Sequence, residues 1–115
     1  MEGFGRELKR VYGHSVGDFG RPERTDDDTL AISAPVPALT DRLVLTEDLT
    51  GGEHIRGFEV YAVLERGYRL LLYRGTTVGH KAICAFPPIR AARFEVKVTG
   101  HDGDWIITSI HPYLT

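Results

Sequence analysis

The chain has 115 residues, a formal net charge of −2 and 42% hydrophobic residues, which is the size and composition of one globular domain with its own core. Its lysines and arginines are scattered, so the concentrated basic face that nucleic-acid binding needs is not found and no nucleic-acid partner is expected. No apolar run approaches the ~20 residues of a membrane-spanning helix, so no membrane partner is expected either.

Residues 1–13 are predicted to form a short linking helix. Four apolar residues recur at spacings of three and four and form one stripe along such a helix: Phe4, Leu8, Val11 and Tyr12. Gly13 stands in the usual C-terminal cap position. Because a helix of this length is not stable alone in water, we expect it to dock on another part of this chain or of a longer protein.

Residues 14–28 are predicted to be an irregular segment, because glycines and Pro22 interrupt every short pattern. Three adjacent aspartates, Asp26 to Asp28, close this segment. Calcium sites use several oxygen ligands, but the carboxylates in calcium loops alternate along the chain. A solvated turn is therefore favoured over a calcium site, and no metal ligands are assigned.

Residues 29–115 show the pattern of short β-strands separated by turn residues. About seven strands are predicted, over residues 29–33, 42–48, 55–64, 68–73, 82–86, 89–99 and 105–114. The clearest alternation places Phe94, Val96 and Val98 on one face and charged residues on the other. Residues 68–73 are apolar on both faces, which is typical of a central strand. Prolines are expected to end the strands at residues 33 and 86.

These strands predict an all-β fold, an antiparallel β-sandwich with a short N-terminal helix. No helical stretch is long enough for a βαβ crossover. The predicted strands run up to and away from a glycine-threonine corner at residues 75–79. Cys84 lies in the apolar strand after this corner and is expected to be a small buried hydrophobic residue.

No catalytic machinery is predicted from the spacing of reactive residues. The five histidines form no pair at zinc-ligand spacing, and no Gly-x-Ser-x-Gly motif accompanies the serines. Glu47 and Asp48 are interpreted as solvated charges at a strand end rather than as one half of a glycosidase pair. We therefore assign no catalytic residues, no metal and no cofactor.

A sugar-binding site is a softer possibility, because sugar sites combine an aromatic face with a few convergent polar groups on loops. The candidate ligand-binding residues are Arg56, His80, Lys81 and Trp105, with His101 as a further hydrogen-bonding group. Trp105 begins a strand beside a polar turn, so it is either a rim residue or a core anchor, with the core favoured. His80 and Lys81 at the corner are either ligand contacts or an ordinary surface turn, with the turn favoured.

Two stretches resemble a known family. Residues 43–60 run from a leucine-rich strand through Glu47-Asp48 to Gly57-Phe58-Glu59-Val60, and residues 75–81 are followed by Phe86-Pro87-Pro88-Ile89. Together they resemble the C-terminal β-sandwich domain of the α-L-fucosidases of glycoside hydrolase family 29. Residues 4–13 are similar to the helix that leads out of the catalytic barrel in those enzymes.

The resemblance implies a jelly-roll sandwich of galactose-binding-like topology. It also implies that the catalytic residues lie elsewhere, since the family carries them on a (β/α)₈ barrel of about 250 residues. The expected function is a non-catalytic accessory domain of a fucosidase that packs on this barrel and borders its sugar site. The alternative is a stand-alone lectin-like module for fucosylated or galactosylated glycans. The sequence leaves the cellular compartment open.

Overall fold

The computed structural model describes residues 14–15, 19–50, 52 and 54–115. The elements are β1 (His14–Ser15), β2 (Glu23–Asp26), β3 (Thr29–Glu47), β4 (Ile55–Val63), the one-turn 3₁₀-helix η1 (Glu65–Gly67), β5 (Arg69–Gly75), β6 (Ala82–His101) and β7 (Ile107–Leu114). All strand pairs are antiparallel, so the prediction of an all-β antiparallel fold is confirmed. The predicted helix at residues 1–13 lies outside the described residues. Within the described part of the chain, no helix is long and apolar enough to cross a membrane.

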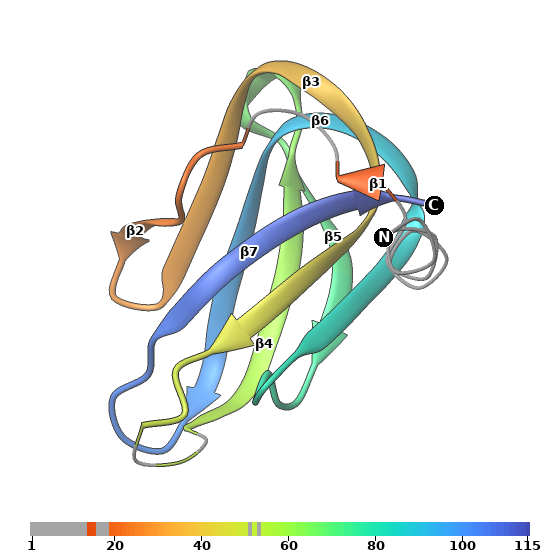
Figure 1. Ribbon diagram of the computed structural model, residues 1–115. Coiled ribbons are helices and arrows are strands. Elements are labelled where there is room, and N and C mark those ends of the chain that lie inside the picture. Colours follow the sequence, from red (N-terminus) through yellow and green to blue (C-terminus); the bar gives the residue numbers. More distant parts are fainter. Residues whose placement is uncertain (1–13, 16–18, 51, 53) are drawn as a thin grey trace, which may run out of the picture.

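The strands follow the order β1-β7-β3-β6-β4-β5, with β2 paired to β3. The two longest strands, β3 and β6, bend sharply and belong to both halves of the fold (Figure 1). The first half of β3 and the second half of β6 lie with β2, β4 and β5 in what we call the β5 layer. The second half of β3 and the first half of β6 lie with β1 and β7 in the β7 layer. The two layers face each other.

Prolines mark the bends but do not end the strands, so that prediction is wrong. Pro35 and Pro37 fall between the pairs Ser33↔Arg93 and Ala38↔Ala91, where the register shifts, and Pro87 and Pro88 fall between the pairs made by Ala85 and Ile89. Proline has no N–H to donate to a ladder, so it is tolerated at such irregularities. Each strand therefore bends at its prolines and continues into the other layer.

Both layers contribute to one hydrophobic core. Fully buried side chains include Phe58, Val60, Phe94 and Val96 from the β5 layer and Leu43, Leu45 and Cys84 from the β7 layer. The predicted inward face of Phe94, Val96 and Val98 is confirmed. Burial raises the pKa of the Cys84 thiol to about 12, so this residue is a buried hydrophobic group as expected.

Two parts of the β5 layer differ from expectation. The strand β2 lies within the segment predicted to be irregular. Residues 68–73 were expected to form a central strand, but β5 lies at the end of the strand order and pairs with β4 alone among the described strands. The prediction of a central position is therefore wrong, because the apolar pattern of a strand reports which faces are covered and not which strands lie beside it.

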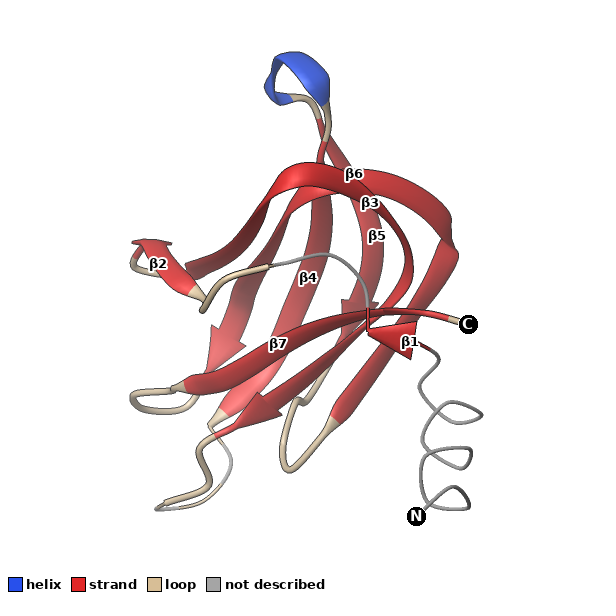
Figure 2. Ribbon diagram, turned by 45° about the horizontal axis from the view of Figure 1, so that its top comes forward, coloured by secondary structure: helices blue, strands red, loops and turns tan. Residues whose placement is uncertain are grey.

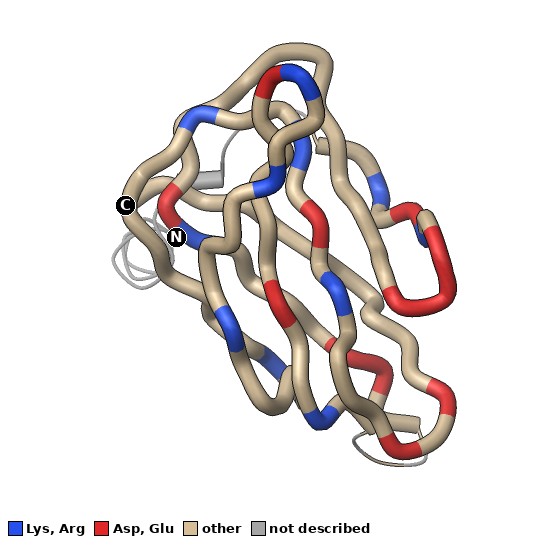
Figure 3. Tube along the Cα trace, turned by 180° about the vertical axis from the view of Figure 1, so that it is seen from behind, with Lys and Arg blue, Asp and Glu red and all other residues tan. Residues whose placement is uncertain are grey.

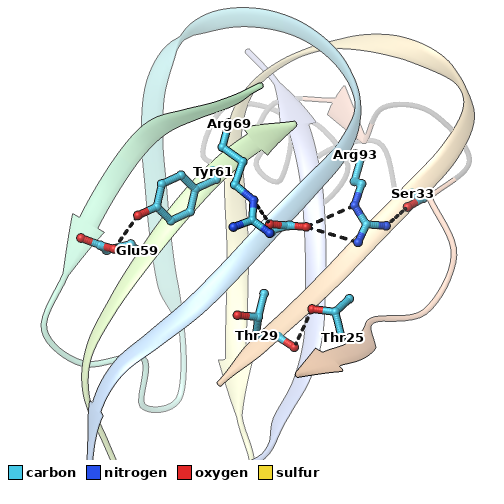
Figure 4. A network of polar contacts seen from close by, with 8 residues as sticks. Thr25, Thr29, Ser33, Glu59, Tyr61, Arg69 and Arg93 are labelled. Carbon is cyan, nitrogen blue, oxygen red and sulfur yellow. Dashed lines mark hydrogen bonds and ion pairs between the residues drawn. The ribbon is translucent and has the colours of Figure 1, made fainter. Parts of the chain in front are cut away.

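The outer face of the β5 layer carries a network of polar contacts (Figure 4). Glu95 is buried beneath two arginines, Arg69 at 2.8 Å and Arg93 at 3.2 Å. The Tyr61 hydroxyl donates to Glu59 at 2.6 Å, which lowers the pKa of Glu59 and raises the pKa of Tyr61. Positive and negative residues lie on neighbouring strands of this layer (Figure 3), where arginines of β5 and β6 pair with glutamates of β4 and β6.

The corner between β5 and β6 has the backbone conformation that its glycines suggest. Gly79 has a φ of 59°, a region that β-branched residues avoid. Replacing Gly79 with valine is expected to lower the free energy of unfolding by about 1–2 kcal/mol, the usual cost of left-handed backbone for an L-residue.

Urea denaturation of the Gly79→Val variant tests this expectation. Gly20→Val is the matched control, because Gly20 has no atom within 4 Å of a built Cβ and no positive φ. Equal stability of the two variants would show that the corner imposes no conformational requirement at residue 79.

Candidate functional site

Three loops lie at the end of the molecule away from the bends (Figure 1). Residues of these loops line two cavities. The described residues of these loops are 27–28, 48–50, 52, 54 and 102–106. The first cavity has a volume of about 340 Å³ and is lined by Arg24, Asp27, Asp28, His101, Asp104 and Trp105. The second has a volume of about 440 Å³ and is lined by Asp48, Thr50, His54, Asp104 and Ile106. Asp104 lines both, so the two cavities adjoin.

Trp105 forms the floor of the first cavity and is also part of the core. It is only 5% exposed, and the Arg24 guanidinium lies 4.3 Å from the centroid of its ring. Arg24 is held there by a hydrogen bond of 2.7 Å from its Nη1 to the Asp27 carbonyl oxygen. A cation over a largely desolvated indole contributes about 0.5–2 kcal/mol. The tryptophan is therefore a core anchor, as favoured from the sequence, and Arg24 covers the ring at the cavity.

Two histidines hold the loop that carries Asp104. His54 Nδ1 lies 2.7 Å from the Asp102 carbonyl oxygen, and His101 Nδ1 lies 2.8 Å from the Gly103 carbonyl oxygen. Because a carbonyl can only accept, Nδ1 is the donor in each ring. In the neutral rings, Nε2 therefore remains as an acceptor for other groups. The backbone N–H of Asp102 also donates to the His54 carbonyl oxygen at 2.7 Å, so the loop is joined to residue 54 twice.

Glu47 connects this end of the molecule to the corner at residues 75–79. It is only 5% exposed. Its Oε2 accepts from the backbone N–H of His54 at 2.9 Å and of Ile55 at 3.2 Å, and its Oε1 accepts from the N–H of Gly79 at 3.2 Å. The interpretation of Glu47 as a solvated charge is therefore wrong. It followed from the position of Glu47 at a strand end, whereas the two loops that fold over it remove it from water.

Two aspartates at this end of the molecule, Asp26 at the end of β2 and Asp48 after β3, accept hydrogen bonds from the backbone two residues further along the chain. Asp26 accepts from the N–H of Asp28 at 2.9 Å, and Asp48 accepts from the N–H of Thr50 at 2.9 Å. These backbone hydrogen bonds lower the pKa of both carboxyl groups. Among the described residues, no three acidic, histidine or cysteine side chains are close enough to hold a metal ion.

The structure does not bring the four predicted ligand-binding residues together at these cavities. Trp105 lines the first cavity, whereas Arg56, His80 and Lys81 line neither of the two and are exposed. His101, the further predicted hydrogen-bonding group, does line the first cavity.

Sequence reasoning missed Arg24, His54 and Asp104. Their positions in turn-rich segments next to strands were visible, but these segments are far apart in the sequence. No local pattern could show that they meet.

Solved structures of other proteins share this fold. A glycoside hydrolase family 29 member from an unknown rumen bacterium matches 96% of this chain with 24% identity and a TM-score of 0.80. The family 29 fucosidase of Ruminococcus gnavus, solved in complex with fucose, matches 76% with 25% identity and a TM-score of 0.66. The resemblance to family 29 α-L-fucosidases is confirmed. The chain spans only 18% to 25% of the length of the fucosidase chains that it matches.

A part of another glycoside hydrolase also has a similar structure. CBM32-1 from a family 31 glycoside hydrolase of Clostridium perfringens matches 80% of this chain and 72% of its own length, with 16% identity and a TM-score of 0.66. Scans against protein-family models and curated proteins found no match. The chain therefore shares its fold with a part of these fucosidase chains and with CBM32-1.

Proposed function

We propose that this chain is the C-terminal, non-catalytic accessory domain of an α-L-fucosidase, with the two layers forming a jelly-roll sandwich of galactose-binding-like topology. The proposal rests above all on one observation: 96% of this chain corresponds to only 21% of a family 29 enzyme. A barrel that carries the family's catalytic residues needs about 250 residues and has no room here. In this proposal residues 1–13 are the helix that connects the domain to the barrel.

The proposal predicts that the purified chain does not hydrolyse a chromogenic α-L-fucoside, because it lacks the barrel that holds the nucleophile and the acid. The release of nitrophenol should equal that of buffer, while the full-length gene product should be active. The coding sequence upstream of Met1 provides the direct check, since it should encode a (β/α)₈ barrel in frame. Turnover by the purified chain, or an upstream region without a barrel, would refute the proposal.

The second candidate function is glycan binding at the loop end. Two observations favour it: the two adjoining cavities, and the similarity to CBM32-1, whose name denotes a carbohydrate-binding module. Titration with fucose and with galactose, followed by amide chemical shifts, is expected to shift residues 101–106 at millimolar sugar. Asp104→Ala should abolish these shifts, because Asp104 lines both cavities. His80→Ala should leave them unchanged, because His80 lines neither cavity.

Trp105→Ala is a poor test of binding, since Trp105 is part of the core and its loss would destabilise the fold. Arg24→Ala is the better companion to Asp104→Ala: Arg24 is exposed, and its removal uncovers the indole ring. A titration with no shifts in the wild type and in Arg24→Ala would reject this second function without affecting the first.

A further inference from the structure

The strand β5 combines the sequence of an interior strand with the position of an edge strand. Its central residues, Leu70 to Tyr73, are apolar without interruption, which is typical of a strand covered on both faces. In the structure β5 ends the strand order and pairs on one side only among the described strands. Leu70 remains 44% exposed and Leu71 42% exposed. A second polypeptide that covers this edge would reconcile the apolar sequence with the exposed leucines.

Both faces of the β5 edge expose apolar surface. Leu70 pairs with Ala62, which faces the core, and Leu71 pairs with Tyr61, which faces outward. Tyr68, just before the strand, is 69% exposed. An edge of this kind also presents unpaired N–H and C=O groups, and folded proteins commonly protect such edges with charged side chains.

The charges that could protect β5 are turned away from its centre. Arg69 at one end pairs with Glu95 at 2.8 Å, and Arg74 at the other end pairs with Glu59 at 3.0 Å. Figure 4 shows the Arg69 guanidinium lying back over the sheet, where it forms the ion pair with Glu95 of β6. The four residues between the two arginines, 70–73, carry no charge of their own, and both flanking arginines are paired with carboxylates of neighbouring strands.

An apolar groove lies beyond the η1 end of the edge. It has a volume of about 540 Å³; its walls include Pro37, Val63, Leu64 and Ala91, with Glu65 and Arg90 as charged lining residues. Val63 pairs with Arg69 of β5, and the Leu64 N–H donates to the Tyr68 carbonyl oxygen at 2.6 Å. The groove and the β5 edge are therefore joined through these residues at the tip of the β4–β5 hairpin, marked by η1 in Figure 2.

We propose that the β5 edge and this groove form the docking surface for the catalytic domain of the same fucosidase chain, which adds an extended segment to β5. This inference rests on the proposed function. The family 29 chains that share the fold carry it as 18% to 25% of a longer polypeptide, so the fold has a covalently attached companion in them. Tethering gives that companion a high effective concentration at the edge, which a free peptide lacks. Strand addition supplies hydrogen bonds to β5, and the leucines on its two faces supply apolar contact area.

The test measures amide hydrogen exchange in β5, both in the 115-residue chain and in the full-length protein encoded by the gene. The amides of residues 70–73 that point away from β4 are expected to exchange at least about tenfold more slowly in the full-length protein, because they become hydrogen-bonded. The amides of β2, an edge on the opposite side of the same layer, should exchange equally in both proteins. Leu71→Lys should remove the protection of β5 in the full-length protein, whereas Ile83→Lys, on the edge of the β7 layer, should preserve it.

The outcomes separate this inference from the function on which it rests. A full-length protein that contains a barrel but leaves β5 unprotected overturns the docking surface and leaves the accessory-domain proposal standing. A full-length protein without a barrel overturns both. If light scattering shows that the 115-residue chain is a dimer and Leu71→Lys makes it a monomer, the occupant of the edge is a second copy, and the inference is wrong.

Discussion

Replacing Glu47 with alanine is expected to lower the free energy of unfolding by about 3–5 kcal/mol. The carboxylate is buried and accepts hydrogen bonds from the backbone N–H groups of His54, Ile55 and Gly79. Its removal leaves these donors without an acceptor, and each unsatisfied buried donor costs about 1–3 kcal/mol. Water that enters the space should bond to some of these N–H groups, so the expected loss is smaller than the sum of three unsatisfied donors.

Two further variants make the Glu47 experiment specific. Glu47→Gln keeps one acceptor oxygen but places an amide donor against a backbone N–H, so an intermediate loss of about 1–3 kcal/mol is expected. Glu65→Ala is the control, since Glu65 is exposed in η1 and should change stability by no more than about 0.5 kcal/mol.

Denaturant unfolding gives the stabilities in the Glu47 series, and hydrogen exchange at Gly79 shows whether the corner has been released. If Glu47→Ala is as stable as Glu65→Ala, the carboxylate does not hold the two loops together.

Replacing Phe94 with alanine is also expected to have a large effect. It should lower the free energy of unfolding by about 3–5 kcal/mol, because it leaves a cavity at the centre of the core. Phe94 is fully buried, and its ring lies 5.7 Å from that of Phe19 and 6.2 Å from that of Phe86. These partners come from the segment before β2 and from the first half of β6, so the ring holds distant parts of the chain together. The cavity also removes dispersion contacts that the surrounding side chains cannot replace.

Urea denaturation measures the Phe94→Ala effect as a shift of the midpoint at constant slope. Phe94→Leu should lose less, about 1.5 kcal/mol, because it keeps most of the volume. Ile106→Ala is the matched surface control, since Ile106 is 55% exposed. A Phe94→Ala variant that unfolds at the same urea concentration as this control would contradict the two-layer core.

The effects of Glu47 and Phe94 differ in how far the sequence predicts them. Phe94 stands in an alternating stretch, and alternation has a direct physical cause: successive side chains of a strand point to opposite faces. Its burial could therefore be predicted. Glu47 follows the same alternation, on the face of Leu43 and Leu45, but its charge argued for solvent. Only the loops that fold over it supply the N–H groups that make burial favourable.

The candidate site shows the same division. The sequence predicted that Trp105 begins the last strand beside a polar turn and that His101 is a further hydrogen-bonding group, and both residues line the first cavity. The corner residues His80 and Lys81 were predicted from their conspicuous local context, but the cavities lie elsewhere. Arg24 could not be predicted, because it reaches the indole ring from a strand 81 positions earlier in the chain.

By itself the sequence determined the all-β class, the inward face of Phe94, Val96 and Val98 and the resemblance to a fucosidase domain, since these depend on side-chain alternation and short motifs. Tertiary structure alone decided that β3 and β6 continue through their prolines, that β5 lies at an edge and that Glu47 is buried. The physical reason is that a strand's neighbours and a buried group's hydrogen-bond partners come from distant segments, and the local pattern carries no record of which segments these are.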